Sequence, residues 1–469
     1  MHLRRRVGWR RLRHSQRPRH SHRHRRRAQG DQHSQSPLAC GCYADEYHWR
    51  DGIGPRDQRA RTINSLWGGV VENHHFGTHE FLDLCDQLSG SEDDAVGGKC
   101  EPYIAGNVGS GTVREMQEWI QYMTYDSDSD LANERRKNGR DEPWKIKFFG
   151  VGNENWGCGG GMHPEYYADE YRKYAEFCRN YSGNELYKVA CGANGRDERW
   201  TRVMMEKVGR RMNGLSLHYY TTDWNNKGSA TDFDVDRYFD TLRRSLQMDE
   251  IVTRHDEVML ERDPDRRIPL VVDEWGTWFD VEPGTNPGFL YQQNTVRDAL
   301  VAGITLNIFH DHARRVKIAN LAQLVNVLQA PILTDGPKMV LTPTYHVLEM
   351  YQVHQDAMRQ DCEIACPHYT RDRSDLDQLH ASASRDADGK LHVSMVNLHH
   401  EEPLDVNLKL AAAATSSSGR IITSETIQSM NTFDAPETVM PGDLDGIEVN
   451  GDTLKVTLPA HSVATIGIE

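Results

Sequence analysis

Between residues 100 and 310 the sequence alternates short runs rich in β-formers with longer runs of helical periodicity. Strict alternation of strand and helix requires parallel strands in an α/β fold. Six such strands, each buried on both faces, predict a (β/α)8 TIM barrel better than an open sheet. The predicted strands are "EPYIAGNVGSGT", "IKFFGVGNENWG", "YKVACGANG", "GLSLHYYT", "RIPLVVDEWGTW" and "ITLNIFH", the last one following a predicted helix "LYQQNTVRDALVAG".

After about residue 350 the hydrophobic pattern changes to period two, as in "LHVSMVNL" and "LDVNLKL". Asn450-Gly451 is a strong hairpin turn signal. These features predict a C-terminal antiparallel β-sandwich without a catalytic cluster, in which residues 411–419 form a loop. We therefore expect a basic segment over residues 1–39, a catalytic (β/α)8 barrel over 40–347 and a β-sandwich domain over 348–469.

The net charge of −14 is unevenly distributed, because residues 1–39 hold twelve arginines, six histidines and one acidic residue. The remaining chain is strongly acidic, which argues against nucleic acid as a partner. We find no apolar run near eighteen residues and no signal peptide, so neither membrane insertion nor secretion is expected. Nine cysteines, mostly isolated, suggest reduced thiols in a cytoplasm rather than a disulfide framework.

Two glutamates end predicted strands. Glu154 follows Gly152-Asn153 in "GVGNENWGCGG", and Glu274 ends the strand in "VVDEWGTWF". Carboxyl ends of barrel strands share one face, so both side chains should point into the same mouth. Glycoside hydrolases use two carboxyl groups that face each other across a cleft. From position alone, an equally good explanation is that both glutamates are strand-end carboxylates that bind loop amides.

Several stretches resemble the intracellular α-L-arabinofuranosidases of glycoside hydrolase family 51. They are "GVGNENWGCGG", "LHYY", "VVDEWGTW" with "EPGTNPGFLYQQNTVRDALVAG", "RVKIANLAQLVNVLQAPILT" and "LTPTYHVLEMY". The similarity runs from about Gly41 to the C-terminus, and its most family-specific part lies around residues 281–330. It implies a retaining, exo-acting, cytoplasmic hydrolase that needs no cofactor and releases terminal α-L-arabinofuranosyl residues from arabinan or arabinoxylan oligosaccharides. It also implies a homo-oligomer, such as a hexamer.

The resemblance also assigns site residues. Glu154 would be the acid/base and Glu274 the nucleophile, with Tyr220 orienting the nucleophile and Tyr219 pointing the opposite way. Four further residues would bind or surround the sugar, and each has a structural alternative. Asn153 would hold the 2-hydroxyl or cap the turn, and Trp278 would line the pocket wall or belong to the core. Gln323 would reach a furanose hydroxyl or lie on a helix surface, and Cys42 would contact the sugar or be a small buried thiol. His218 is as well explained as a core residue.

Histidines offer a metal-site alternative. His310 and His312 in "FHDH", and the pair His74-His75, have ligand residue types. No third ligand is spaced as a zinc or facial-triad motif requires, so we expect no catalytic metal.

The sequence departs from the family at its start. The family's first barrel strand and first helix have no counterpart before Gly41, and residues 1–39 are too rich in Arg, His and Ser to bury a core. We expect this segment to be disordered, and the abrupt switch favours a wrong reading frame or a misplaced gene start. The run "SGSEDDAVGGK" (89–99) is expected to be a harmless insertion. Three hypotheses stay open: an active arabinofuranosidase, an inactive fragment of one, and a related barrel hydrolase that acts on β-xylosides or β-glucans.

Overall fold

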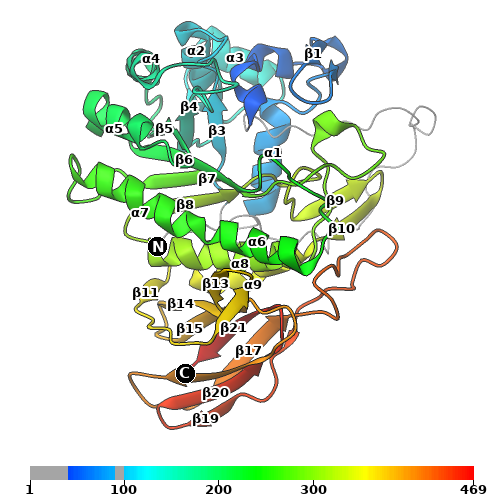
Figure 1. Ribbon diagram of the computed structural model, residues 1–469. Helices are drawn as coiled ribbons and strands as arrows, with labels where there is room; N and C mark the ends of the chain where they lie inside the picture. Colours follow the sequence, from blue (N-terminus) through cyan, green and yellow to red (C-terminus); the bar gives the residue numbers. More distant parts are fainter. Residues whose placement is uncertain (1–40, 90–99) are drawn as a thin grey trace. The chain divides into compact units, whose positions relative to one another are not determined.

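The computed structural model describes residues 41–89 and 100–469 (Figure 1). The predictions for residues 1–39 and for nearly all of the insertion at 89–99 lie outside this range. The described chain divides into two compact units, one of residues 41–193 and 199–216, and one of residues 194–198 and 217–469. We call them the N-terminal and C-terminal units and describe each by itself. None of the described helices is both long and apolar enough to cross a membrane.

The N-terminal unit alternates strands and helices, as predicted. Its elements are β1 (Thr62–Asn64), β2 (Val70–Glu72), α1 (Thr78–Ser89), β3 (Tyr103–Gly106), α2 (Val113–Thr124), α3 (Asp130–Lys137), β4 (Phe148–Val151), α4 (Pro164–Phe177), β5 (Tyr187–Asn194), α5 (Glu198–Lys207) and the start of β6 (Gly214–Thr221). Strands β3, β4 and β5 pair in parallel. All four residues of β4 are buried, as expected for a parallel strand covered on both faces.

Local sequence explains where the helices begin. The Thr112 hydroxyl accepts a hydrogen bond from the Glu115 amide and caps α2. Pro164 occupies the first turn of α4, where its missing N–H costs nothing. The apolar face of α2 buries Met116, Trp119 and Ile120, so the helix is held by packing of one face.

The first half of the C-terminal unit continues this alternation. It contains the end of β6, then α6 (Val235–Ser245), α7 (Gln247–Leu260), β7 (Leu270–Thr277), α8 (Val296–Asp311), β8 (Val316–Leu321), the hairpin β9 (Ile332–Asp335) and β10 (Lys338–Leu341), and α9 (Pro343–Met350). Strands β7 and β8 pair in parallel, with two register irregularities.

One predicted element is wrong. "ITLNIFH" is not a strand but the second half of α8, and the next strand is β8, in "VKIANL". The cause is burial: all residues of α8 from Val296 to His310 are buried, including the polar Arg297 and Asp298, so the helix has no exposed polar face. Periodicity cannot separate such a helix from a buried strand.

The second half of the C-terminal unit is an antiparallel β-sandwich, as predicted. Its strands are β11 (Met358–Gln360), β14 (Leu379–Arg385), β15 (Leu391–Asn397), β16 (Leu404–Lys409), β17 (Ser417–Ile422), β18 (Gly442–Asp443), β19 (Glu448–Asn450), β20 (Thr453–Leu458) and β21 (Ser462–Ile468). The strands β12 (His368–Arg371) and β13 (Ser374–Asp377) form a separate hairpin. The sheet β11-β14-β15-β21-β17-β18 and the sheet β16-β20-β19 share one apolar core. The β19–β20 hairpin turns at Gly451 and Asp452, one residue beyond the predicted Asn450-Gly451 pair, because Asn450 still pairs with Thr453. Residues 417–419, predicted as loop, belong to β17.

A buried arginine fixes the start of the strand that carries Glu274. The Arg315 carbonyl accepts the amide of Leu270, the first residue of β7, at 2.9 Å. The Arg315 side chain, 1% exposed, donates to Asp263 at 2.9 Å and also pairs with Asp256. Asp256 pairs in addition with Arg266, whose side chain is 24% exposed. The buried ion pairs thus hold the beginnings of β7 and β8 together.

Arg315→Ala is expected to destabilise the protein much more than Arg266→Ala, although both side chains pair with Asp256. Removing Arg315 leaves the buried Asp263 carboxylate without its cationic partner, held by the amides of Arg267 and Ile268, and breaking a buried pair in this way costs about 3–5 kcal/mol. The more exposed Arg266 pair should be worth about 1 kcal/mol or less. Urea denaturation of the two variants measures the difference. Equal losses would show that Arg315 contributes no more than a surface ion pair.

Candidate active site

Glu154 lies in a tight turn that follows β4 in the N-terminal unit. Its backbone is left-handed, with φ of 47°, two residues after Gly152, which has φ of 88°. A left-handed glutamate is strained, and such strain concentrates at functional sites. The amides of Gly157 and Gly159 donate to the Glu154 carbonyl at 2.8 and 3.0 Å and close the turn. The turn presents the Glu154 side chain in a half-buried position.

The glycines of "GVGNENWGCGG" are explained by close backbone contact. A Cβ atom on Gly159 would lie only 2.0 Å from the carbonyl oxygen of Asn153. Any side chain there would force the turn apart, because real Cβ contacts are never that short. Trp156 anchors the same turn, since its indole N–H donates to the Gly192 carbonyl at 3.1 Å. The motif therefore builds a compact support for Glu154.

Asp45 stabilises this turn through hydrogen bonds, and the sequence analysis did not identify it as a site residue. Its buried carboxylate accepts hydrogen bonds from the amides of Val108 and Gly109, both at 2.7 Å, and from the Asn153 amide at 2.9 Å. Burial raises the pKa of Asp45 to about 6, against the lowering effect of these amides. The signal in the sequence is weak, because Asp45 is one acid among several in "GCYADEYHW".

Asn153 is buried, and its side-chain amide donates to the Gly41 carbonyl at 3.0 Å. It thereby ties the turn to residues 41–45, in addition to the bond that its backbone makes with Asp45. Asn153 therefore has a structural role in this turn. Its predicted contact with a sugar 2-hydroxyl stays a prediction.

Cys42 and Cys158 form a disulfide beside Glu154, with an S–S distance of 2.09 Å. Their Sγ atoms lie 3.4 and 3.1 Å from Oε2 of Glu154. The expectation that the cysteines are reduced thiols is therefore wrong for this pair, and Cys42 is half-buried rather than buried. Sequence could not reveal the pairing, because 116 residues separate the partners and only the fold brings them together.

Glu274 lies on β7 in the C-terminal unit, 5% exposed. The Tyr220 hydroxyl donates to its Oε2 at 2.7 Å, as the resemblance predicts for a residue that orients the carboxylate. Tyr219, the preceding residue, points away and donates to the Arg244 carbonyl at 2.8 Å. This alternation follows from the period of two in strand β6. Glu274 is thus a buried carboxylate with a fixed orientation.

His218 is part of the same cluster. Its Nδ1 lies 3.6 Å from Oε2 of Glu274, and its Nε2 lies 3.2 Å from Oδ1 of Asp273. The sequence left His218 equally well explained as a core residue. It is 2% exposed, yet it faces two carboxylates, so its position is that of a polar partner of the Glu274 side chain.

Trp278 and Gln323 lie in the same unit. The Trp278 ring meets the Tyr220 ring edge-on, with centroids 4.9 Å apart, and its buried indole N–H has no hydrogen-bond partner among the described residues. Gln323 follows β8, is 7% exposed and lies in no helix, so the alternative of a helix-surface glutamine is wrong. Their contacts with a sugar stay predictions.

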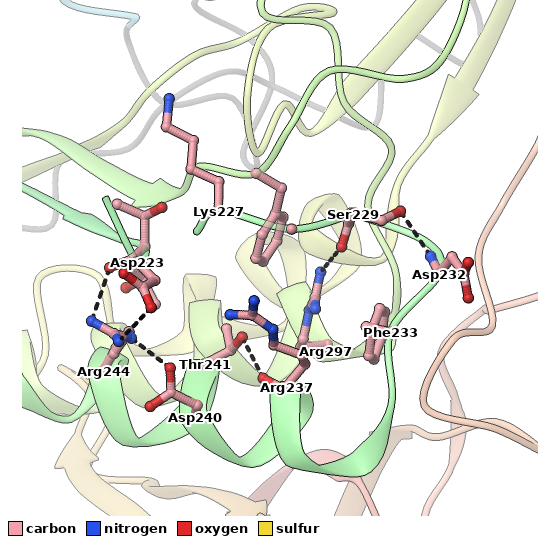
Figure 2. Close-up of a pocket in the computed structure, with 14 residues that line it drawn as sticks. Asp223, Lys227, Ser229, Asp232, Phe233, Arg237, Asp240, Thr241, Arg244 and Arg297 are labelled. Atoms are coloured by element: carbon pink, nitrogen blue, oxygen red, sulfur yellow. Dashed lines mark hydrogen bonds and ion pairs between the residues drawn. The ribbon is translucent and has the colours of Figure 1, made fainter. Parts of the chain in front are cut away.

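A small cavity of about 90 Å³ lies beyond the end of β6 (Figure 2). Its charged residues largely pair with one another or with backbone, as Arg244 does with Asp223 and Asp240. Arg297 is buried between the rings of Phe233 and Phe279, at 3.7 and 3.8 Å from their centroids. Its guanidinium donates to the Ala230 carbonyl at 3.0 Å. Burial lowers the pKa of Arg297 to about 10, so it stays charged at neutral pH and fastens the loop after β6 to the start of α8.

The histidines considered as metal ligands have other partners. His310 contacts the Ser382 hydroxyl at 2.8 Å, and His312 contacts Asp249 at 2.7 Å. His74 contacts the Tyr43 hydroxyl at 3.0 Å. Among the described residues of the N-terminal unit, the side chains of Cys42, Glu154 and Cys158 converge as metal ligands do. Their spacing in the sequence did not indicate this group.

Comparisons with known proteins agree with this arrangement. Two family models match the chain: the α-L-arabinofuranosidase 1 domain over residues 38–238, and the α-L-arabinofuranosidase C-terminal domain over residues 273–462. An intracellular exo-α-L-arabinofuranosidase of Bacteroides ovatus is 49% identical over 433 residues, which cover 92% of this chain and 82% of the relative.

Solved structures give the same result. The GH51 arabinofuranosidase of Xanthomonas axonopodis pv. citri superimposes with a TM-score of 0.88 at 45% identity, over 92% of this chain and 86% of that one. The α-L-arabinofuranosidase of Thermotoga maritima, in complex with arabinose, superimposes with a TM-score of 0.77 at 25% identity, over 92% and 86% of the two chains. The predicted fold class, a (β/α)8 barrel followed by an antiparallel β-sandwich, is confirmed. The chain therefore belongs to glycoside hydrolase family 51, the α-L-arabinofuranosidases.

Proposed function

We propose that this chain is a retaining, exo-acting α-L-arabinofuranosidase that removes terminal α-L-arabinofuranosyl residues from arabinan or arabinoxylan oligosaccharides. The observation that carries the proposal is the buried Glu274 carboxylate on strand β7, held at 2.7 Å by the Tyr220 hydroxyl. The 49% identity to an intracellular exo-α-L-arabinofuranosidase supports the substrate class and a cytoplasmic location.

In the proposed first step, an oxygen of Glu274 attacks the anomeric carbon while Glu154 gives its proton to the glycosidic oxygen, and the aglycone leaves. In the second step, Glu154 takes a proton from water, and the water oxygen displaces Glu274 from the anomeric carbon. The Tyr220 hydrogen bond to Oε2 fixes the orientation of the Glu274 carboxylate for this attack. Retention requires the two carboxyl groups to lie about 5 Å apart in the working enzyme.

The remaining site residues take supporting roles in this proposal. Asn153 and Gln323 bind sugar hydroxyls, Trp278 walls the pocket and offers its indole N–H, and Cys42 contacts the sugar. The catalytic barrel comprises residues 40–347 and the β-sandwich residues 348–469. The enzyme is a homo-oligomer, such as a hexamer, which light scattering after gel filtration measures directly.

Removing either carboxylate should lower activity in a way that distinguishes the two roles. Glu274→Ala is expected to lower turnover of an aryl arabinofuranoside by at least about 10⁴-fold, because no nucleophile remains. Glu154→Ala should retain activity on substrates whose leaving group needs no proton, and azide should restore turnover by replacing water as the second-step nucleophile. Glu165→Ala, an exposed glutamate on α4, is the control and should be fully active. Equal loss on good and poor leaving groups would contradict the acid role of Glu154.

The substrate class is tested against the β-glycosidase alternative. An aryl α-L-arabinofuranoside should be cleaved faster than the corresponding β-xyloside or β-glucoside at equal concentration. Because the proposed steps use only carboxyl groups and water, dialysis against EDTA should leave this activity intact. Faster cleavage of a β-glucoside, or loss of activity in EDTA that is restored by a metal ion, would mean that the proposed reaction is wrong.

A further inference from the structure

Two sulfur atoms and one carboxylate oxygen converge beside the turn that follows β4. The Sγ atoms of Cys42 and Cys158 lie 3.4 and 3.1 Å from the same oxygen of Glu154, and the three ligand atoms all lie within 4.8 Å of one another. Cys158 is exposed and Cys42 half-buried, so small reagents and ions can reach the pair.

The three side chains are held in place by the backbone around them. Cys42 begins the short 3-10 helix Cys42–Asp45, which is tied to β4 because Asp45 accepts the Asn153 amide at 2.9 Å. Cys158 lies between the two glycines whose amides donate to the Glu154 carbonyl. Breaking the S–S bond therefore leaves both sulfur atoms near the carboxylate, because none of these hydrogen bonds depends on the disulfide.

Reduction changes the chemistry of this cluster. A dithiol reductant transfers two electrons and two protons to the S–S bond, which yields two Cys thiols and the cyclic disulfide of the reductant. Two thiolates with a carboxylate form a donor set suited to a tetrahedral Zn²⁺ ion, whose fourth position water can fill. Zn–S bonds of about 2.3 Å place two sulfur ligands about 3.7 Å apart, a spacing within the 4.8 Å that encloses the three ligand atoms.

We propose that Cys42, Cys158 and Glu154 form a three-ligand site for Zn²⁺ or a similar thiophilic cation when the disulfide is reduced, and that the disulfide closes this site. Disulfides are rare in a reducing cytoplasm, where those that form are usually catalytic or redox-sensing. A metal-bound Glu154 carboxylate cannot carry the proton that the leaving group needs. Zinc therefore inhibits the reduced enzyme, a consequence that rests on the proposed function, whereas the site itself does not.

The test is zinc binding to the full chain in its two redox states. One sample is reduced with dithiothreitol and freed of it by gel filtration under argon, and one is kept oxidised. Mass spectrometry after iodoacetamide treatment should find two more alkylated cysteines in the reduced sample. Competition with a chromophoric chelator then measures bound Zn²⁺, and Co²⁺ serves as a probe because thiolate-bound cobalt absorbs in the near ultraviolet.

Variants separate this site from other zinc ligands, including the six histidines of residues 1–39. Reduced wild-type protein should bind about one equivalent of Zn²⁺ more than reduced Cys42→Ala or Cys158→Ala, and Glu154→Gln should bind about tenfold more weakly or worse. Cys362→Ala, at a half-buried cysteine of the sandwich, should keep the extra equivalent. Oxidised wild-type protein should lack it, and this comparison holds even where an alanine variant misfolds.

An extra equivalent that persists in Cys158→Ala and in the oxidised protein would overturn the proposal, as would its absence from the reduced wild type. Turnover of an aryl arabinofuranoside is measured separately, and it should fall as zinc fills the reduced site and return with EDTA. Zinc binding as described, in a protein with no glycosidase activity in any state, would leave the site standing and refute the proposed function instead.

Discussion

The Asp45 carboxylate is the contact on which the surroundings of Glu154 in the N-terminal unit depend. A buried carboxylate is costly unless hydrogen bonds compensate it. Here three backbone amides, from two separate loops, point at its two oxygens. The loop after β3 and the turn after β4 are thereby joined to the segment that carries Cys42, and the left-handed Glu154 next to Asn153 can persist because its surroundings over-determine it.

Glu274, in the C-terminal unit, is held in place by different contacts. Glu274 sits on a strand whose start is fastened by the Arg315 ion pairs and whose carboxylate is oriented by Tyr220, with His218 nearby. One carboxylate thus stands on a rigid strand and the other on a tight, half-buried turn. In the proposed mechanism this difference suits a nucleophile that keeps one orientation and an acid that exchanges its proton with incoming and leaving groups.

Sequence patterns predicted the strands and helices that recur along the chain, and they missed the features that depend on contacts between residues far apart in sequence. The strands β4 and β7 are visible as β-rich runs, so Glu154 could be placed just after one strand and Glu274 on the other, although β7 continues three residues beyond Glu274. The period of two separates Tyr220 from Tyr219. The helix α8 was half misassigned because uniform burial removes its amphipathic signal. Three contacts are revealed only by the fold, because they join residues far apart in sequence or lack a characteristic spacing. They are the hydrogen bonds of Asp45, the Cys42–Cys158 bond and the contact of His218 with Asp273.

The central claim is that Glu274 forms a covalent bond to the sugar while Glu154 moves the proton. It is tested most directly by incubating the enzyme with an activated arabinofuranoside whose glycosyl-enzyme hydrolyses slowly, followed by mass spectrometry of the digested protein. The account predicts one added arabinofuranosyl-type group per chain, on the peptide that contains Glu274, and a product of retained configuration. An adduct on Glu154, or a product of inverted configuration formed without any adduct, would contradict it.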